Sequence, residues 1–510
     1  MKKYIQPFLY ASLLFSISLS SCTKNFTEIN TDPNNIPFAL PEQLLAPALT
    51  QVMTYNMTRN RTFNNELMQV TVNQSDADIT VFRYDFKDSY SDYLYNGWYT
   101  QLTNIKDIYR YSSEALNYNA SYMGISLTLQ SWIYSMLTDS YGDIPFSESN
   151  KGKSDNIIEP KFDTQKDIYD SIFANLDSAN TLLSKGASIT AASDPVFNGD
   201  IAKWRKFSNS LYLRLLLRVS GKKEVQPKVV AKIQEIIGSS AKYPLMASND
   251  DNAVLRWTGD GAYVSPFMNT RPQDFRVPSI CSFFIDHLVT WSDPRINAPE
   301  YGIGGVNRLG LAPISGNYVG VHSGYIPGQG EAKGSYFYAT DSKIGTAAPA
   351  ITMQTEPKTG LIMNYAELQF ILAECVVKGW INGDAEQYYK NGIESGIKYW
   401  IPEYNVPIED YIAGADIQWN SNGTFDEKME QIGLQKYYVL LWADLEQWFE
   451  YRRTGHPILE KGPGLKNGGI MPARMKYPIY VRATNPTNYK AAIQRQGPDE
   501  ISTQVWWQKP

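Results

Sequence analysis

Two stretches of the sequence combine aromatic rings with hydrogen-bonding side chains outside strong helical patterns. A ring can cover the apolar face of a ligand, and amide, carboxylate or guanidinium groups can bond to its hydroxyls. This combination suits a sugar ring, which has a C–H face and a fringe of hydroxyls. The candidate ligand-binding residues are Asn73, Gln74, Asp76, Arg83, Tyr84 and Trp98 in the first stretch and Trp257, Tyr263, Phe267, Arg271, Asp274 and Phe275 in the second.

Four of these side chains also fit a structural role. Trp98 is in phase with an apolar helix face, which favours a place in the core. Trp257 precedes a Thr-Gly turn, and this position favours neither a buried nor an exposed ring. Arg83 and Arg271 are also compatible with a solvated surface. The two stretches therefore define a region for the site rather than individual contacts.

Carboxylates are the side chains from which catalysis could be built, and we considered Asp139, Asp143, Asp250 and Asp251. Two opposed carboxylates suffice for glycoside hydrolysis, so a surface glycosidase is the alternative that stays open. Against it, Asp143 falls in a turn motif, and the Asp250-Asp251 pair indicates a loop or a weak cation site. The sequence contains no nucleophile elbow, no zinc-protease motif and no nucleotide-binding loop. We predict no catalytic residue and no cofactor.

Charge and histidine content exclude other classes. The formal net charge is −5 and no basic stripe is present, so nucleic acid is not an expected partner. The three histidines, His287, His322 and His456, lack the spacing of metal ligands, and we predict no metal site. Tyr 35, Phe 20 and Trp 12 make the chain unusually aromatic, which suits half-wet recognition surfaces as well as cores.

The N-terminus predicts the compartment. Residues 1–21 have basic, apolar and small-residue segments in the order of a secretory signal, and Leu19-Ser20-Ser21-Cys22 is similar to a lipoprotein cleavage box. Cys22 would then become the first residue and carry acyl chains, which anchor a protein stably to a membrane. A plain secretory signal is the alternative. Residues 22–40 are expected to form a lipidated tether, and no later segment reaches the length of a membrane span.

Helical patterns dominate both ends of the remaining chain, 41–510, which we expect to form a single domain. Apolar residues recur at helical spacing in 98–118, in the segment that ends at the Tyr141–Pro145 turn, and in 165–184, 201–219, 361–378, 384–400 and 427–453. The last of these ends with Arg452 and Arg453, expected to pair with carboxylates or helix-end carbonyls, and with Gly455 at the cap.

The middle of the chain has a different character. About 240–358 is rich in Gly, Pro, Ser and Asn and predicts loops, a few short strands and one helix near 279–291. The tail after Gly462 is expected to be loop-rich. Cys281 and Cys375 are predicted to be buried thiols, with one disulfide as the alternative. The helical scaffold is therefore expected at about 41–238 and 360–456, with consecutive helix pairs that suggest a tetratricopeptide-like solenoid.

Six segments in order along the chain together resemble the SusD/RagB family of Bacteroidetes surface lipoproteins. No single segment is specific for a family, but the occurrence of all six in this order behind a lipoprotein box is specific. They are Asn30–Asn34, Tyr141–Pro145, Trp204–Arg214, Tyr365–Glu367 with Ala373-Glu374, Gln435-Lys436 with Glu450–Pro457, and Pro472–Arg474 with Tyr477-Pro478, Asn485, Asn488 and the terminal Val505–Trp507.

The resemblance implies an all-α, SusD-like fold: a tetratricopeptide-like helix-pair solenoid with an irregular, loop-rich centre that carries the ligand surface. It implies a surface-exposed protein attached to the outer membrane through its lipid anchor. It also implies a SusC-like TonB-dependent barrel as partner, over which the lipoprotein acts as a hinged lid that captures a nutrient and delivers it. The aromatic richness favours a glycan or oligosaccharide without identifying it. A peptide-binding lipoprotein of the same import class and a purely structural envelope protein remain alternatives.

Overall fold

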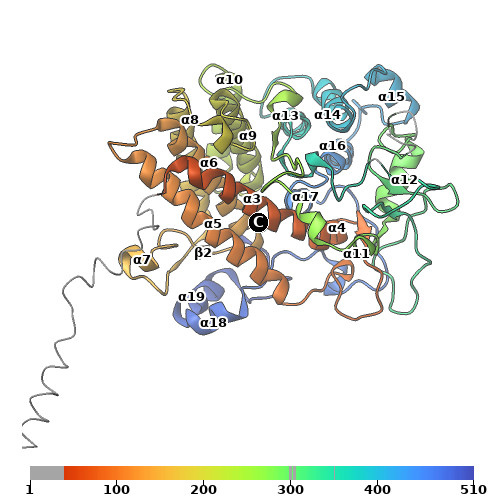
Figure 1. Ribbon diagram of the computed structural model, residues 1–510, viewed down its shortest axis with the longest axis horizontal. Helices are drawn as coiled ribbons and strands as arrows, with labels where there is room; N and C mark the ends of the chain where they lie inside the picture. Colours follow the sequence, from red (N-terminus) through yellow and green to blue (C-terminus); the bar gives the residue numbers. More distant parts are fainter. Residues whose placement is uncertain (1–38, 298–300, 302–305, 350, 510) are drawn as a thin grey trace, which may run out of the picture. The chain divides into compact units, whose positions relative to one another are not determined.

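The first half of the domain is a row of antiparallel helices, each packed against its neighbour in the chain (Figure 1). The computed structural model describes residues 39–297, 301, 306–349 and 351–509. The long helices of this half are α3 (Pro41–Arg59), α5 (Ser89–Ser113), α6 (Ala120–Tyr141), α8 (Gln165–Leu183), α9 (Ile201–Val219) and α10 (Gln226–Gly238). Asn119, Thr164 and Asp200 cap α6, α8 and α9 by accepting hydrogen bonds from first-turn amides.

The second group of helices packs on the first through α9. It contains α13 (Tyr365–Val377), α14 (Ala385–Trp400), α15 (Ile408–Gly414), α16 (Phe425–Val439) and α17 (Glu446–Thr454). Helix α13 contacts α14, α16 and α9, and a capping box of Thr424 and Glu427 begins α16. The all-α, helix-pair architecture predicted from the sequence is confirmed.

The prediction of one continuous helix over 427–453 is wrong, because the structure divides this segment into α16 and α17. Trp442 and Asp444 in the connection have φ angles of 71° and 41°, which a helix does not allow. The buried Asp444 accepts hydrogen bonds at its carboxylate from Asn56 Nδ2 (2.7 Å) and Trp132 Nε1 (2.8 Å). These contacts with α3 and α6 outweigh the local helical propensity.

Buried arginines join the two halves. Arg214 of α9 forms a bidentate pair with Glu367 of α13 (2.7 and 2.5 Å), and Arg218 pairs with Glu446 and with Asp139. Arg453 pairs with Glu374 and Glu450, as expected for the end of this helix. Arg452 donates to the carbonyls of Asp139 and Ala473, and Gly455 caps the helix at a φ of 78°. Pairing with carboxylates compensates the desolvation of Arg214, Arg218 and Arg453.

The irregular middle is held by short antiparallel strand pairs. They are β1 (Thr71–Val72) with β5 (Ser279–Ile280), β4 (Ala253–Val254) with β8 (Leu361–Met363), and β6 (Leu311–Ala312) with β7 (Tyr336–Phe337). A further pair in the first half joins β2 (Ile144–Pro145) to β3 (Phe162–Asp163). The helix predicted near 279–291 is α12 (Ser282–Thr290), whereas the four-residue helix α11 (Pro272–Phe275) in the same region was not predicted.

Short elements complete the domain. They are the π-helix η1 (Asn60–Asn64), α4 (Asn65–Leu67), η2 (Val81–Arg83), α7 (Gly152–Asp155), η3 (Ala191–Ser193), η4 (Asn249–Asp251), η5 (Pro266–Asn269), α11 (Pro272–Phe275), η6 (Pro357–Thr359), η7 (Asn467–Gly469), α18 (Ile479–Thr484), α19 (Pro486–Gln496) and η8 (Trp506–Gln508). The prediction of a loop-rich tail thus missed α18 and α19. Cys281 and Cys375 are free and buried, as predicted, and not joined by a disulfide. Within the described ranges, no helix is long and apolar enough to cross a bilayer.

Candidate ligand-binding surface

Six of the twelve candidate ligand-binding side chains belong to the core, and a ligand cannot reach them from solvent in this structure. Their predicted role in binding is therefore corrected to a structural one. They are Arg83, Tyr84, Trp98, Trp257, Phe267 and Phe275, none of which is more than 3% exposed.

Polar contacts explain the place of three of these buried side chains. Trp98 Nε1 donates to Asn56 Oδ1 (2.7 Å), and Trp257 Nε1 lies 3.0 Å from the sulfur of Met57. Both tryptophans thus fix the inner face of α3. Arg83 donates to the carbonyls of Ser75, Ala77 and Tyr325, so it holds together the loops that surround it.

The predicted residues of the first stretch that remain accessible lie on the loop after β1. Gln74 donates to the Glu331 carbonyl and accepts from Ser279, while Asp76 accepts from the Gly328 amide. These bonds tie the loop to the irregular middle. Asn73 is exposed and lines a cavity of about 210 Å³ between this loop and the start of α5.

The wall of this cavity combines rings, hydroxyls and one ionisable group of each sign. We call it the Glu66 cavity. Its lining residues are Glu66, Asn73, Ser75, Ala77, Ile79, Thr80, Val81, Phe86, Lys87 and Tyr90. Glu66 is the one carboxyl among the described residues that line it. Donors, acceptors and aromatic edges on one concave wall are the features of a small-molecule site.

Glu66 has an unusual protonation behaviour for a carboxyl. Burial raises the pKa of Glu66 to about 8, although a bond from the Phe82 amide and the nearby Arg61 oppose this shift. The carboxyl is therefore largely protonated at neutral pH and can donate as well as accept a hydrogen bond. Glu66 was not predicted as a site residue, and its place directly before the apolar pair Leu67-Met68 is the signal that could have found it.

Arg61 connects the second predicted stretch with the segment that carries Glu66. It lies in the π-helix η1, directly before α4, which carries Glu66. Its Nη2 donates to the Asp274 carbonyl (3.0 Å), and its guanidinium lies 4.9 Å from the centroid of the Phe275 ring. The extra residue of a π-turn changes which way the following side chains point, and such turns are frequent at functional sites.

Aromatic side chains continue the surface along α5. The guanidinium of Arg59 lies 4.8 Å from the ring centroids of both Tyr90 and Tyr93, and Tyr93 contacts Tyr55 edge to face at 5.1 Å. All four side chains are partly exposed. Neither Tyr90 nor Tyr93 was predicted, because helical periodicity alone does not show which face of α5 stays accessible.

The second predicted stretch forms the outer rim of this surface. Tyr263 is half-buried, and Arg271 and Asp274 form an exposed ion pair at 2.7 Å. On the neighbouring loop, Tyr336 and Tyr338 flank the buried Phe337, and both rings are partly exposed. The buried Phe267, Phe275, Phe337 and Trp442 support this rim from below, with ring centroids 5.0 to 5.8 Å apart.

Gln354 joins the two loops of the rim. This buried amide donates to the carbonyls of Phe267 (3.2 Å) and Thr270 (2.7 Å) and accepts from the amide of Thr340 (3.1 Å). A side chain that satisfies backbone groups of two loops fixes their relative position. The rim is therefore preorganised.

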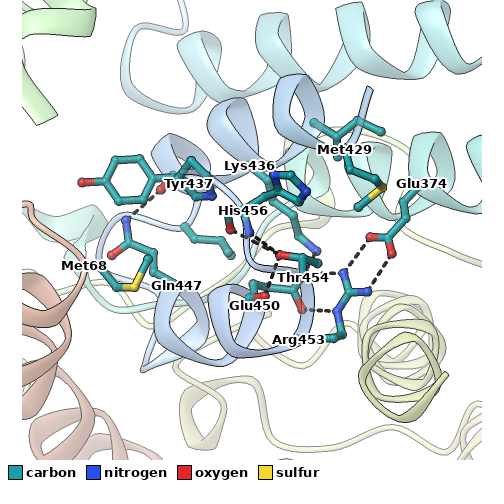
Figure 2. Close-up of a pocket in the computed structure, with 14 residues that line it drawn as sticks. Met68, Glu374, Met429, Lys436, Tyr437, Gln447, Glu450, Arg453, Thr454 and His456 are labelled. Atoms are coloured by element: carbon teal, nitrogen blue, oxygen red, sulfur yellow. Dashed lines mark hydrogen bonds and ion pairs between the residues drawn. The ribbon is translucent and has the colours of Figure 1, made fainter. Parts of the chain in front are cut away.

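A second enclosed region, shown in Figure 2, has a structural role. It lies between α16 and α17 and has a volume of about 20 Å³, which is room for roughly one water molecule. Figure 2 shows the bidentate pair of Arg453 with Glu374 and the hydrogen bond from Gln447 to the Tyr437 carbonyl. These contacts fill the space, so it offers no place for a nutrient.

The carboxylates considered for catalysis hold the scaffold. Asp139 is buried and accepts from Tyr169 and Trp507, while Asp143 pairs with Arg495 at 2.9 Å. Asp251 pairs with Lys206 at 2.9 Å, and Asp250 lies beside it in η4. No group of three or more His, Cys, Asp or Glu side chains gathers as metal ligands within the part of the chain that the structure describes.

These features define a class: a helix-pair scaffold of the tetratricopeptide-like type whose accessible rings and polar groups lie on its loops and helix ends. The family model described as SusD-like, starch-binding and associating with the outer membrane matches residues 33–478. The chain belongs to this SusD-like family, which confirms the resemblance that the sequence motifs indicated.

Solved structures share the fold over nearly the whole chain. A chitin-binding protein is 26% identical, with a TM-score of 0.73 over 92% of this chain and 99% of that chain. A chitin-binding SusD homologue from Flavobacterium johnsoniae is 21% identical (TM-score 0.73; 92% and 98% covered), and a SusD homologue from Bacteroides fragilis is 23% identical (TM-score 0.71; 92% and 100% covered). No curated protein sequence matches the chain.

Proposed function

We propose that this protein is a lipid-anchored surface protein that binds a glycan and delivers it, chemically unchanged, to a SusC-like TonB-dependent transporter in the outer membrane. The Glu66 cavity with its aromatic surroundings carries this proposal, since rings and hydrogen-bonding groups together match a sugar ring. Membership of a family described as starch-binding, and the likeness to a chitin-binding protein at 26% identity, support a glycan as ligand.

Binding without catalysis is favoured by the composition of the cavity. Glycoside hydrolysis commonly needs two carboxyl groups on opposite sides of the scissile bond. Glu66 has the raised pKa of a general acid, but no second carboxyl accompanies it among the described lining residues. Its protonated form instead suits it to bond with a sugar hydroxyl as donor or acceptor.

The experiment that tests the proposal is a binding titration of the full chain with chitin and starch oligosaccharides. We expect saturable binding, and about 5-fold weaker binding by Asn73→Ala, since one lost hydrogen bond costs about 1 kcal/mol. The matched control is Asn117→Ala, because Asn117 is also exposed and does not line the cavity.

Other outcomes of this titration separate the alternatives. Shortened oligosaccharide products would contradict a binding-only role and favour a glycosidase. Binding of peptides in place of every oligosaccharide tested would favour the peptide-binding alternative. An equal affinity of the Asn73→Ala and Asn117→Ala variants would remove the Glu66 cavity from the glycan site.

A further inference from the structure

A larger cavity lies on another face of α5, away from the Glu66 cavity. Its volume is about 410 Å³, within the range of roughly 300 to 1,000 Å³ that is common for ligand pockets. Three segments far apart in sequence form its walls: α5, the region from Pro145 to Phe162, and α18. Figure 1 shows α18 beside α5 and β2. The two cavities have no lining residue in common.

The walls of this larger cavity are fixed by hydrogen bonds between the segments. Tyr99 Oη donates to the Pro145 carbonyl (2.6 Å), Asn485 Nδ2 donates to the Pro160 carbonyl (2.7 Å), and Tyr480 Oη donates to Asn96 Oδ1. A site whose walls are already joined loses little conformational entropy when a ligand binds.

The lining offers rings and amides but no charge. Tyr95 and Tyr99 lie with ring centroids 4.7 Å apart, and Tyr480 is 42% exposed. Asn96 Nδ2 and Asn150 Oδ1 have no hydrogen-bond partner among the described residues, so one donor and one acceptor remain for a ligand. Asp, Glu, Lys and Arg are all missing from the described lining residues.

This chemistry selects a neutral ligand. A phosphate, carboxylate or ammonium group would lose its hydration here without gaining a countercharge, which is unfavourable. A ligand with an apolar face and hydroxyl or amide groups at its edge would instead meet the rings and both free amide groups. We propose that this cavity is a second binding site for a neutral saccharide, distinct from the Glu66 cavity. The inference rests on the proposed glycan-binding function.

The two sites lie on different sides of α5. Tyr90 lines the Glu66 cavity and Tyr99 the second one, and nine residues at about 3.6 residues per turn place them on opposite faces of the helix. Each site can therefore take its own ligand molecule.

The second site is tested by filling it. Thr100 is exposed, lines the cavity, and has a hydroxyl that bonds to the Asn96 carbonyl one turn earlier. Thr100→Arg places a long side chain in the cavity while keeping a good helix former on α5. Thr181→Arg is the matched control, because Thr181 on α8 is exposed, makes the same bond to Asp177 and lines no described cavity.

The probes are the tetrasaccharides of N-acetylglucosamine and of glucose, titrated into the full chain by calorimetry and followed by hydrogen–deuterium exchange. For a tetrasaccharide that binds, we expect two molecules per chain for the wild type and Thr181→Arg, and one for Thr100→Arg. Ligand protection of segment 479–485 should also be lost in Thr100→Arg.

Two results would overturn the second site. In the first result, Thr100→Arg has the same stoichiometry and the same protection as Thr181→Arg, and Asn73→Ala binds the ligand more weakly than the wild type. This result would contradict the second site and leave the proposed function intact. The absence of binding of either tetrasaccharide to the wild-type chain would contradict both.

Discussion

Glu66 shows how one buried side chain combines binding chemistry with a cost in stability. Because burial raises its pKa to about 8, the folded chain keeps a proton that the unfolded chain, with a carboxyl pKa of 4.5, releases at neutral pH. The folded state therefore loses stability relative to the unfolded state as pH rises from about 5 to 8. A residue that lowers stability at working pH is more readily explained by ligand binding than by packing.

The variant Glu66→Gln tests this protonation state. A neutral amide of similar shape has no proton to lose, so we expect the variant to gain stability over the wild type as pH rises from 5 to 8. The gain is about 1.4 kcal/mol for each pH unit between the unfolded and the folded pKa of Glu66. Denaturant unfolding at pH 5 and pH 8 measures it, with the exposed Glu159→Gln as control. A difference that stays constant with pH would show that Glu66 is charged in the folded protein.

At the scale of elements, His456 fastens the end of α17 to α16. Its ring nitrogens bond to Glu430 (2.7 Å) and Asp426 (3.2 Å), both on α16. Burial by itself lowers the pKa of His456, but these two carboxylates outweigh burial, and the pKa is raised above 6.5. The imidazolium is thus stabilised in the folded state, and its contribution is fully present below pH 6.5 and is lost as pH rises through the raised pKa.

The variant Glu430→Gln should remove most of this contribution. We expect it to be less stable than the wild type at pH 5.5 and close to the wild type at pH 9, where the ring is neutral. Thermal unfolding at the two pH values checks this, with Asp410→Asn on the exposed face of α15 as control. An equal loss at both pH values would mean that the Ile458 amide bond to Glu430, and not the histidine, provides the stability.

The sequence predicted most long helices because their apolar residues repeat at helical spacing. It failed where contacts distant in the chain decide the structure, as at Trp442 and Asp444, whose positive φ angles depend on partners in α3, α6 and the irregular middle. The prediction of the candidate site failed for the same reason. Residue type located the two stretches, but Arg83 and Trp257 are buried by partners that periodicity does not reveal.

At the scale of the whole molecule, Cys22 is the residue that is predicted to determine where the protein is located. It lies outside the described residues, together with the predicted signal peptide and nearly all of the tether, so the anchor remains a prediction. We expect Cys22→Ala to release the protein from the outer-membrane fraction, because an acylated cysteine is the anchor that the sequence predicts.

Membrane fractionation followed by immunodetection measures this release. The control is Cys281→Ser, which alters a buried thiol and leaves the predicted anchor intact. From detergent-solubilised membranes, the wild type should copurify with a large barrel protein, and Cys22→Ala should not. An unchanged membrane fraction of Cys22→Ala would contradict the lipid anchor.

The hydrogen bonds of the Gln354 amide have a consequence for how the ligand specificity of such a protein evolves. The side chain of Gln354 bonds to backbone groups of both rim loops, and the one side-chain bond that it accepts comes from the Thr340 hydroxyl (3.4 Å), so it can hold the loops when other side chains on them change. Tyr263, Tyr336 and Tyr338 can therefore be exchanged one by one while the frame beneath them keeps its form. Under the proposed glycan-binding function, substitutions at these three partly exposed rings would change which ligands the rim contacts and leave the fold unchanged.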